Sequence, residues 1–222
     1  MSVWAVLVAA GRGERLGLDR PKAFAALRGR PLLAESVERL EASDWVDAIV
    51  VAAAPGWEEP VILLSEELAA GKVVEVVTGG ETRARSVRAA LDRVGADAAA
   101  VVVHDAARPL VDDEVIGRVL APLGEGWNGA VPVVPVPDTL KRVRGDAIVE
   151  TVDRSDLVAV QTPQAFVPGD LRDALAGDID AAPDCASLVE AAGGRVTAVP
   201  GDARLLKVTE PHDLALVEAL LA

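Results

Sequence analysis

The sequence is short of cysteine, histidine and aromatic residues, and it lacks long apolar runs. It holds one cysteine, two histidines, two phenylalanines and no tyrosine. The single cysteine, Cys185, cannot form a disulfide within the chain, argues against a cysteine metal cage and suits a reducing compartment. No apolar stretch approaches the ~20 residues that a membrane-spanning helix needs. We therefore expect a soluble, cytoplasmic protein with no membrane partner.

Positive charge is also scarce. Lysine and arginine together number 22, against 35 aspartates and glutamates, which gives a formal net charge of -13. A general nucleic-acid binder gains most of its affinity from Lys and Arg placed along phosphates, so this balance argues against a nucleic-acid partner. Any anionic ligand must be small and must be bound by a local group of cations.

Hydrophobic residues are plentiful, at 51% of 222 residues, which is enough for one extensive core. Runs of β-branched residues alternate with stretches of helical periodicity, and this alternation is typical of an α/β fold with a mostly parallel sheet flanked by helices. Because we find no linker or repeat, we expect a single domain over residues 1–222. The expected strands are 3–10, 47–54, 72–77, 99–105, 129–136, 157–162 and 195–199, and the expected helices are 31–43, 82–94 and 210–222.

Within the expected helices, apolar residues recur at helical spacing. Thr82 stands where it can cap the second of these helices. The apolar stripes are Leu33, Val37 and Leu40 in the first helix, Val87 and Leu91 in the second, and Leu214, Val217 and Leu221 in the last.

Residues 138–154 break this pattern. They have no helical stripe but have two extended runs around the sequence RGD, which is typical of a β-hairpin. The faces of this hairpin are largely polar, so it has little reason to pack on the main core. Two placements remain open: an arm that projects and pairs with a second subunit, or an edge hairpin that lies on its own sheet.

The most informative stretch is VLVAAGRGERLGLDRPK, residues 6–22, in which an apolar run opens into a glycine-broken loop. Glycines after the first strand of an α/β sheet let backbone N–H groups approach an anion. The P-loop pattern is absent, and the dinucleotide pattern GxGxxG fails because Leu16 stands at its third glycine. The loop carries four cations, Arg12, Arg15, Arg20 and Lys22, and therefore predicts phosphate binding of another kind.

The sequence VVVHDAARP ends an expected central strand, at the edge where ligands bind in open α/β sheets. Asp105 can bind a metal or a substrate hydroxyl there, and Arg108 can bind a phosphate. A helix cap with a salt bridge is the alternative interpretation. We interpret His104 as structural.

A second polar cluster, TGGETRARS, begins the helix expected at 82–94 and contains Gly79, Gly80, Arg83 and Ser86. The free N–H groups of a helix start suit a base or a phosphate. Ordinary helix capping explains the same residues nearly as well.

The pattern AAGxGxR followed by PK resembles the nucleotidyltransferases that join a nucleoside monophosphate to a sugar phosphate or a sugar alcohol phosphate. Further motifs, VHDAARP, DTLK, VDR, TPQ and KVT, follow in order along nearly the whole chain. With them, the sequence resembles the 2-C-methyl-D-erythritol 4-phosphate cytidylyltransferase family, which makes CDP-methylerythritol from CTP. The resemblance implies a Rossmann-like nucleotidyltransferase fold, Mg²⁺ as the cofactor, and a homodimer in which residues 138–154 form the dimerisation arm.

The resemblance also implies roles for individual residues. The implied catalytic residues are Arg15 and Lys22, which stabilise the transition state, and Arg154 and Lys207, which orient the acceptor. The implied CTP-binding residues are Ala9, Ala10, Gly11, Gly13, Arg15, Lys22, Gly80, Ser86 and Asp105. The implied residues for methylerythritol phosphate are Asp105, Arg108, Thr139, Arg154, Thr162 and Lys207, with Thr139 and Arg154 supplied by a partner subunit. The CTP phosphates are expected to carry most of the Mg²⁺, with Asp105 as a candidate protein ligand.

The chain departs from the family pattern at three positions. Ala23 replaces a frequent glutamine after PK, Cys185 replaces an acidic residue, and Leu205 replaces a common asparagine. Three other functions stay open: a ribitol 5-phosphate cytidylyltransferase, a sugar-1-phosphate or molybdopterin nucleotidyltransferase, and a non-catalytic nucleotide-binding regulator. The DTLK and VDR motifs argue against the second, and the retained Arg15, Lys22, Arg154 and Lys207 argue against the third.

Overall fold

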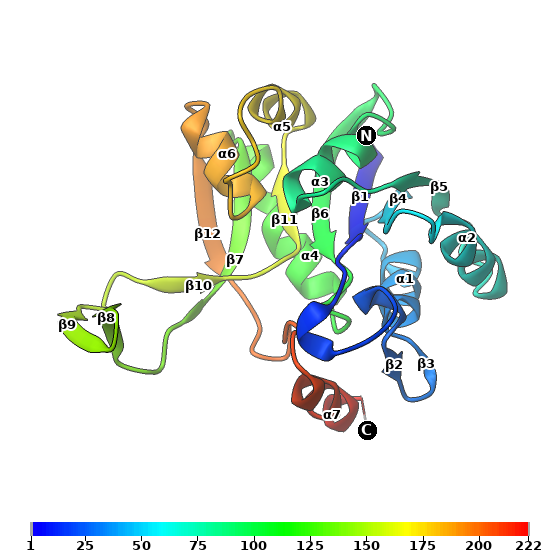
Figure 1. Ribbon diagram of the computed structural model, residues 1–222. Helices are drawn as coiled ribbons and strands as arrows, with labels where there is room; N and C mark the ends of the chain where they lie inside the picture. The colour runs from blue at the N-terminus through cyan, green and yellow to red at the C-terminus, as the bar shows by residue number, and fades with distance from the viewer. Residues whose placement is uncertain (1, 222) are drawn as a thin grey trace.

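The computed structural model describes residues 2–221 and shows a central sheet with helices on both faces (Figure 1). Seven of the eight strands lie in the order β10-β7-β11-β6-β1-β4-β5, and β12 pairs with β7. The strands are β1 (Ser2–Ala9), β4 (Ala48–Ala53), β5 (Val73–Thr78), β6 (Ala98–Asp105), β7 (Gly129–Pro135), β10 (Val158–Val160), β11 (Gln164–Phe166) and β12 (Val196–Pro200).

The sheet is mostly parallel, as predicted. The pairs β1–β4, β1–β6, β4–β5 and β7–β12 are parallel, whereas β10 and β11 run antiparallel to their neighbours. The strand expected at 157–162 is shorter than predicted, because it ends at Val160 before the chain turns into β11. Strand β11 has only three residues, too few to show an alternating pattern in the sequence.

The two faces of the sheet carry separate hydrophobic layers. Along β1, Ala5 and Leu7 point to one face and Val6 points to the other. Helices α1 (Leu32–Ala42), α2 (Glu58–Glu67) and α4 (Asp113–Leu120) cover the first face. Helices α3 (Arg83–Leu91), α5 (Pro168–Leu175) and α6 (Cys185–Ala191) cover the second. The α/β architecture with flanking helices is therefore confirmed.

The expected helical stripes are buried in α1 and α3, whereas in the last helix Val217 is buried and Leu214 and Leu221 are partly buried. The stripe residues of α1 and α3 have side chains that are at most 1% exposed, and Thr82 caps α3 by accepting a hydrogen bond from the Arg85 N–H. Helix α7 (Pro211–Leu220) lies outside the two layers, where Val217 packs on the short β2 (Ala26–Leu27) and β3 (Arg30–Pro31) region. Four further helices, α2, α4, α5 and α6, were not assigned from the sequence.

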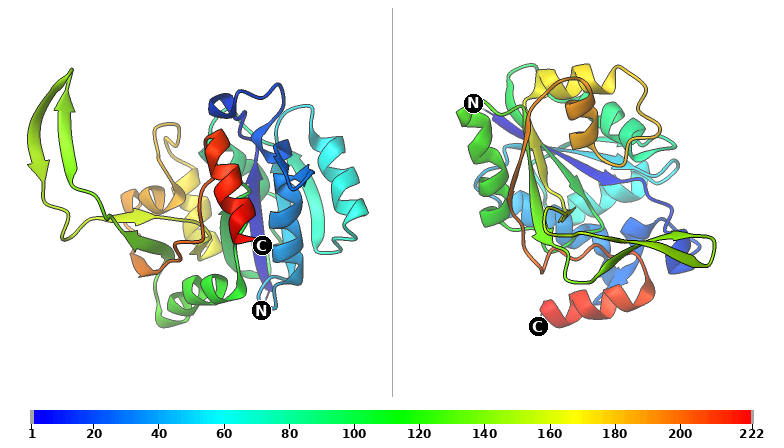
Figure 2. Two further views of the ribbon diagram at one scale, coloured as in Figure 1. Left: turned by 90° about the horizontal axis from the view of Figure 1, so that it is seen from below. Right: turned by 90° about the vertical axis from the view of Figure 1, so that its left-hand side faces the viewer.

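The hairpin predicted at 138–154 is present as β8 (Leu140–Arg144) and β9 (Ala147–Val152), which form a sheet of their own. It projects away from the body in both Figure 1 and Figure 2. Its faces are less polar than expected, since Val143, Ile148 and Val149 are 55%, 65% and 49% exposed. We call β8, β9 and their connections, residues 138–154, the arm.

Among residues 2–221, no helix has the length and apolar character needed to cross a bilayer.

Candidate active site

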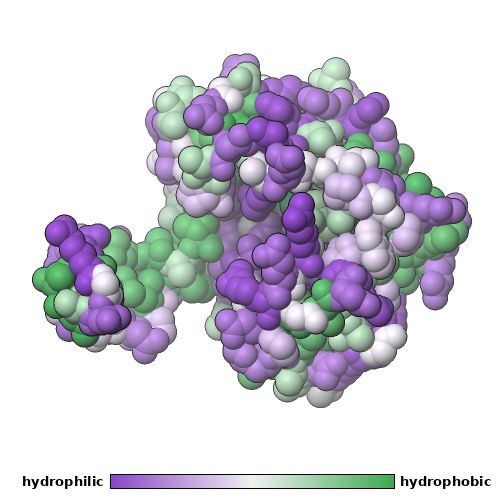
Figure 3. Space-filling view, in the orientation of Figure 1, coloured by the Kyte–Doolittle hydropathy of each residue, from purple (hydrophilic) through white to green (hydrophobic). Residues whose placement is uncertain are grey.

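The carboxyl ends of β1, β4, β5 and β6 lie at one edge of the sheet, as parallel pairing requires. The loops that follow them enclose a cleft of about 1140 Å³. Figure 3 shows hydrophilic residues gathered around a hollow in this face of the molecule. The predicted site residues that line the cleft are Ala9, Ala10, Gly11, Gly13, Arg15, Lys22, Gly80, Ser86, Asp105 and Lys207.

The first loop is shaped by close backbone packing. Gly13 has a φ of 73°, and a Cβ added there would lie 2.9 Å from the Lys22 Cβ. The Lys22 N–H donates to the Gly11 carbonyl at 3.0 Å, which closes the loop. Only glycine fits position 13, because a side chain would meet both an unfavourable backbone conformation and the Lys22 stem. The local sequence therefore places Lys22 beside the glycine turn.

The side chain of Lys22 reaches across the cleft. Its Nζ donates to the Val208 carbonyl at 2.7 Å, and Val208 lies 186 residues away in the sequence. Burial, followed by the nearby charge of Lys207, lowers the pKa of Lys22 to about 8. Lys22 is therefore a cation that is easily deprotonated in the free protein, and a bound polyphosphate would favour its charged form.

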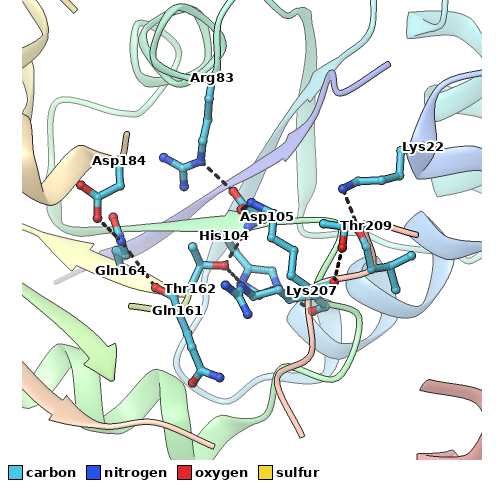
Figure 4. A network of polar contacts seen from close by, with 12 residues as sticks. Lys22, Arg83, His104, Asp105, Gln161, Thr162, Gln164, Asp184, Lys207 and Thr209 are labelled. Atoms are coloured by element: carbon cyan, nitrogen blue, oxygen red, sulfur yellow. Dashed lines mark hydrogen bonds and ion pairs between the residues drawn. The ribbon is translucent and has the colours of Figure 1, made fainter. Parts of the chain in front are cut away.

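Asp105 lies between two cations at the end of β6 (Figure 4). Arg83 Nε donates to Oδ1 at 2.8 Å, and Lys207 Nζ donates to Oδ2 at 2.7 Å. Burial alone would raise the pKa of Asp105, but the charges of Arg83 and Lys207 outweigh it and hold that pKa well below its usual range. Asp105 is therefore ionised at neutral pH, and this three-residue cluster carries one net positive charge.

A buried polar layer supports the end of β6. His104 is fully buried, and its two ring nitrogens pair with the Thr162 hydroxyl at 3.1 Å and the Arg108 carbonyl at 3.0 Å. Burial lowers the pKa of His104 to about 4, so its ring is neutral and structural, as predicted. Thr162 Oγ1 also accepts the Asp105 N–H at 3.1 Å, which fixes the backbone beneath the carboxylate.

Two predicted substrate residues of this region lie outside the cleft lining. Thr162 lies below Asp105 with its hydroxyl already paired. Arg108 Nη1 donates to the Leu205 carbonyl at 2.6 Å, while Arg108 Nε is buried without a partner among residues 2–221. Their roles in binding an acceptor stay predictions.

The loop after β5 forms the opposite wall. The Gly80 N–H donates to Ser86 Oγ at 3.0 Å, and the Ser86 hydroxyl lies 3.0 Å from the Thr82 carbonyl. A Cβ at Gly79 would lie 2.4 Å from the Ala10 Cβ, so this wall packs directly against the first loop. The Thr82 cap is therefore present, and the binding of a base or a phosphate by Gly80 and Ser86 stays a prediction.

Thr139 and Arg154 lie away from the cleft, at the base of the arm. Arg154 Nη1 donates to the Val136 carbonyl, and Arg154 lines a separate groove of about 720 Å³ with Leu157 and Val199. One chain therefore does not bring these residues to Lys22 and Asp105. The predicted contribution from a partner's arm is compatible with this placement and stays a prediction.

Arg83 lines the cleft, and the sequence placed it in the polar cluster at the start of α3 without indicating a partner for its side chain. It is the first residue of α3, and its side chain lines the cleft while holding Asp105. A cation in the first turn opposes the helix dipole, since that end of a helix favours anions. That unfavourable placement is the sequence feature that could have indicated a special role for Arg83. Its partner carboxylate, Asp105, lies 22 residues away, and no sequence pattern links the two.

The three departures from the family pattern lie in or beside this region. Ala23 is buried and lines the cleft, and Leu205 is buried in the core below it. Cys185 Sγ lies 3.5 Å from Arg83 Nη1, and burial raises the pKa of its thiol. The thiol at position 185 is therefore neutral beside the Arg83 guanidinium.

The described residues do not form a cage for a resident Mg²⁺. Residues 2–221 contain no cluster of three or more His, Cys, Asp or Glu side chains suited to a metal. Asp105, the predicted ligand, already uses one oxygen for Arg83 and the other for Lys207. Mg²⁺ is usually bound through one or two carboxylates together with substrate phosphates, so an ion here would come with a phosphorylated ligand.

The arrangement suits charge neutralisation better than acid–base catalysis. Arg15, Lys22 and Lys207 line one cleft of a chain whose net charge is -13, and the buried histidine lies below the cleft. Transfer of a phosphorus group depends mainly on positioning and on stabilising the charge of the phosphate oxygens. The cleft therefore suits a phosphorylated ligand and the neutralisation of its negative charge.

Comparisons with known proteins identify the family. A family model described as 2-C-methyl-D-erythritol 4-phosphate cytidylyltransferase matches residues 3–222. A protein of that name from Saccharopolyspora erythraea is 48% identical over 227 residues, with 100% of each chain covered. Another from Frankia casuarinae is 48% identical over 221 residues, which cover 99% of this chain and 81% of the relative. The crystal structure of the Thermus thermophilus protein of that name is 36% identical, with a TM-score of 0.79 and 97% of each chain covered. These matches confirm the predicted family: the chain belongs to the 2-C-methyl-D-erythritol 4-phosphate cytidylyltransferases, a family of nucleotidyltransferase enzymes.

Proposed function

We propose that this chain transfers the cytidylyl group of CTP to 2-C-methyl-D-erythritol 4-phosphate. The products are CDP-methylerythritol and pyrophosphate, in the non-mevalonate synthesis of isoprenoid precursors. Family membership supplies the identity of the substrates. The observation that supports the same chemistry here is the cleft, where Arg15, Lys22 and Lys207 lie around the buried carboxylate of Asp105.

In the reaction, a phosphate oxygen of the acceptor attacks the α-phosphorus of CTP. The new P–O bond forms as the bond to the β-phosphate oxygen breaks, and pyrophosphate leaves with the bonding electrons. The nucleophile is already an anion, so no side chain has to remove a proton. We assign the stabilisation of the transition state to Arg15 and Lys22, with Lys22 exchanging its bond to the Val208 carbonyl for one to a phosphate oxygen.

The acceptor is assigned to the Asp105 side of the cleft. Lys207 is 40% exposed and ends in a mobile ammonium, so it can bind the acceptor's phosphate. We assign to Asp105 the acceptance of a hydrogen bond from an acceptor hydroxyl. Thr139 and Arg154 complete the site from the arm of a second subunit, and this makes the active enzyme a homodimer. The exposed Val143, Ile148 and Val149 support this assignment, because a partner would cover them.

Mg²⁺ belongs to the substrate in this proposal, as the magnesium complex of CTP. When bound, the ion neutralises part of the triphosphate charge. We expect EDTA to abolish turnover and to leave the unfolding temperature of the substrate-free protein unchanged, because Asp105 is neutralised by Arg83 and Lys207. A large drop in unfolding temperature on adding EDTA would contradict a substrate-borne metal and favour a resident one.

The direct test is pyrophosphate release with CTP and Mg²⁺, comparing 2-C-methyl-D-erythritol 4-phosphate with ribitol 5-phosphate. Turnover with the first acceptor alone supports the proposal. Turnover with ribitol 5-phosphate alone keeps the mechanism and contradicts the assigned acceptor. Binding of CTP without turnover of either acceptor would favour a nucleotide-binding regulator. We place this activity in the cytoplasm, where a lone buried thiol such as Cys185 stays reduced.

A further inference from the structure

The two cations that hold Asp105 differ in how firmly they are placed. The Arg83 side chain is 22% exposed and rises from the first turn of α3, whereas the Lys207 side chain is 40% exposed and rises from an irregular segment. The carboxylate between them is 8% exposed. Arg83 is therefore the more enclosed partner of this cluster, and Lys207 is the more exposed one.

Among residues 2–221, the guanidinium of Arg83 pairs with no carboxylate other than Asp105. Nε binds Asp105, Nη1 meets only the neutral thiol of Cys185, and Nη2 is buried without a hydrogen-bond partner among residues 2–221. A buried guanidinium that leaves one nitrogen unpaired carries a cost in folding free energy. The bond to Asp105 is the one ion pair of Arg83 among residues 2–221, so holding that carboxylate is the role that its contacts indicate.

Under the proposed function, the Lys207 ammonium pairs with two different anions, the Asp105 carboxylate and the phosphate of the acceptor substrate. It binds Asp105 in the free protein, and it must reach the acceptor's phosphate for the reaction. If Lys207 were the only counter-ion, its departure would leave a buried carboxylate without compensation, which is strongly unfavourable. A second, fixed cation on the other oxygen removes this obstacle.

We propose that Arg83 is a positioning residue, the fixed counter-ion of Asp105 that leaves Lys207 free to exchange Asp105 for the phosphate of the acceptor. This inference rests on the proposed function, because it concerns how the acceptor's phosphate is captured. Arg83 acts through Asp105 and Lys207, so its removal weakens acceptor binding more than CTP binding. The loss arises because Lys207 becomes the sole partner of Asp105 and is held there.

The test compares steady-state kinetics of the wild type, Arg83→Gln and Arg83→Lys, with each substrate varied in turn. We expect Arg83→Gln to raise KM for the acceptor about 10-fold or more while changing KM for CTP by less than about 3-fold. Arg83→Lys keeps the charge with fewer donors, so it should recover part of that loss. A matched control is Arg118→Gln, because Arg118 also pairs with one carboxylate, has a buried unpaired nitrogen, and lies on α4 against the other face of the sheet.

If Arg83→Gln does not fold, a second set of variants tests the same inference. In a Lys207→Gln background, Arg83→Lys should add little to the acceptor KM, because the exchange it assists is already lost. Equal rises in both KM values, or a full additional loss in the Lys207→Gln background, would overturn the inference. An active wild type with an unchanged Arg83→Gln variant contradicts this inference alone, whereas a wild type silent with every acceptor contradicts the proposed function.

Discussion

Lys22 is the cleft cation whose present partner a phosphate could most easily replace. Its ammonium lies on a backbone carbonyl rather than a carboxylate, so a phosphate can replace that partner without breaking an ion pair. We expect Lys22→Ala to fold normally and to lose on the order of 10²-fold in kcat, by analogy with lost oxyanion donors. Circular dichroism and pyrophosphate release measure the two properties.

Lys72 offers a matched control for that substitution. Its Nζ donates to the Ser43 carbonyl at 2.6 Å, which is the same kind of half-buried contact far from the cleft lining. Lys72→Ala should therefore keep wild-type turnover. An active Lys22→Ala enzyme would show that the cation at position 22 does not stabilise the transition state.

The lowered pKa of Lys22 predicts a pH dependence with a definite sign. A pKa of about 8 means that Lys22 is charged below that pH and loses its proton as the pH rises through it. Because kcat/KM reports groups of the free enzyme, kcat/KM for CTP should fall about 10-fold per unit above pH ~8. A Lys22→Arg enzyme should lack this fall, since guanidinium does not titrate in this range. A wild-type profile that stays flat to pH ~9.5 would contradict the assignment of this group.

At the scale of elements, the arm is a hairpin with two different faces. Val143 and Ile148 are cross-strand partners and are both exposed, whereas Arg142 and Glu150 form an ion pair next to them. Glutamate at both apolar positions should raise the dimer dissociation constant ~10-fold or more, because a partner subunit would have to bury two charges. The unfolding temperature should stay close to wild type, because neither side chain packs on the body. Light scattering after size-exclusion chromatography, over a range of protein concentrations, gives the dissociation constant.

The control for that variant is the double substitution Arg142→Ala with Glu150→Ala. It removes an exposed ion pair, which is worth little, and leaves the apolar face intact. It should therefore remain dimeric. A monomeric wild type would contradict the arm's role, and so would a dimer that tolerates both glutamates.

The sequence predicted elements best where they are long and regular. The apolar runs of β1, β4 and β6 and the stripes of α1 and α3 emerged as predicted, because burial follows their periodicity. Strand β11 was missed because three residues carry too little pattern, and the helices α2, α4, α5 and α6 were missed as well. In the site, the sequence missed contacts between residues that lie far apart along the chain. The loop residues around Lys22 are adjacent in sequence, but its contact with Val208 and the contact of Arg83 with Cys185 span 186 and 102 residues.

At the scale of the whole molecule, the proposed site is divided between two separate parts of the chain. Lys22 and Lys207 line the cleft of the body, while Arg154 lines a groove at the base of the arm. The arm projects away from the body, as the left view of Figure 2 shows. If Arg154 takes part in the reaction, a closed symmetric dimer supplies it from the other subunit, since each subunit then gives one arm and receives one.

Mixing two inactive variants tests this division. Lys22→Ala damages the cleft and leaves the arm intact, whereas Arg154→Ala damages the arm and leaves the cleft intact. When equal amounts are exchanged into mixed dimers, half of the dimers hold both variants, and each of these has one complete site. Activity should therefore return to about a quarter of the wild-type value.

Lys22→Ala mixed with Lys207→Ala should stay inactive, because both defects lie in the cleft and no combination restores a complete one. An absence of recovery in the first mixture, with subunit exchange confirmed by differently tagged chains, would show that the arm does not complete the partner's site.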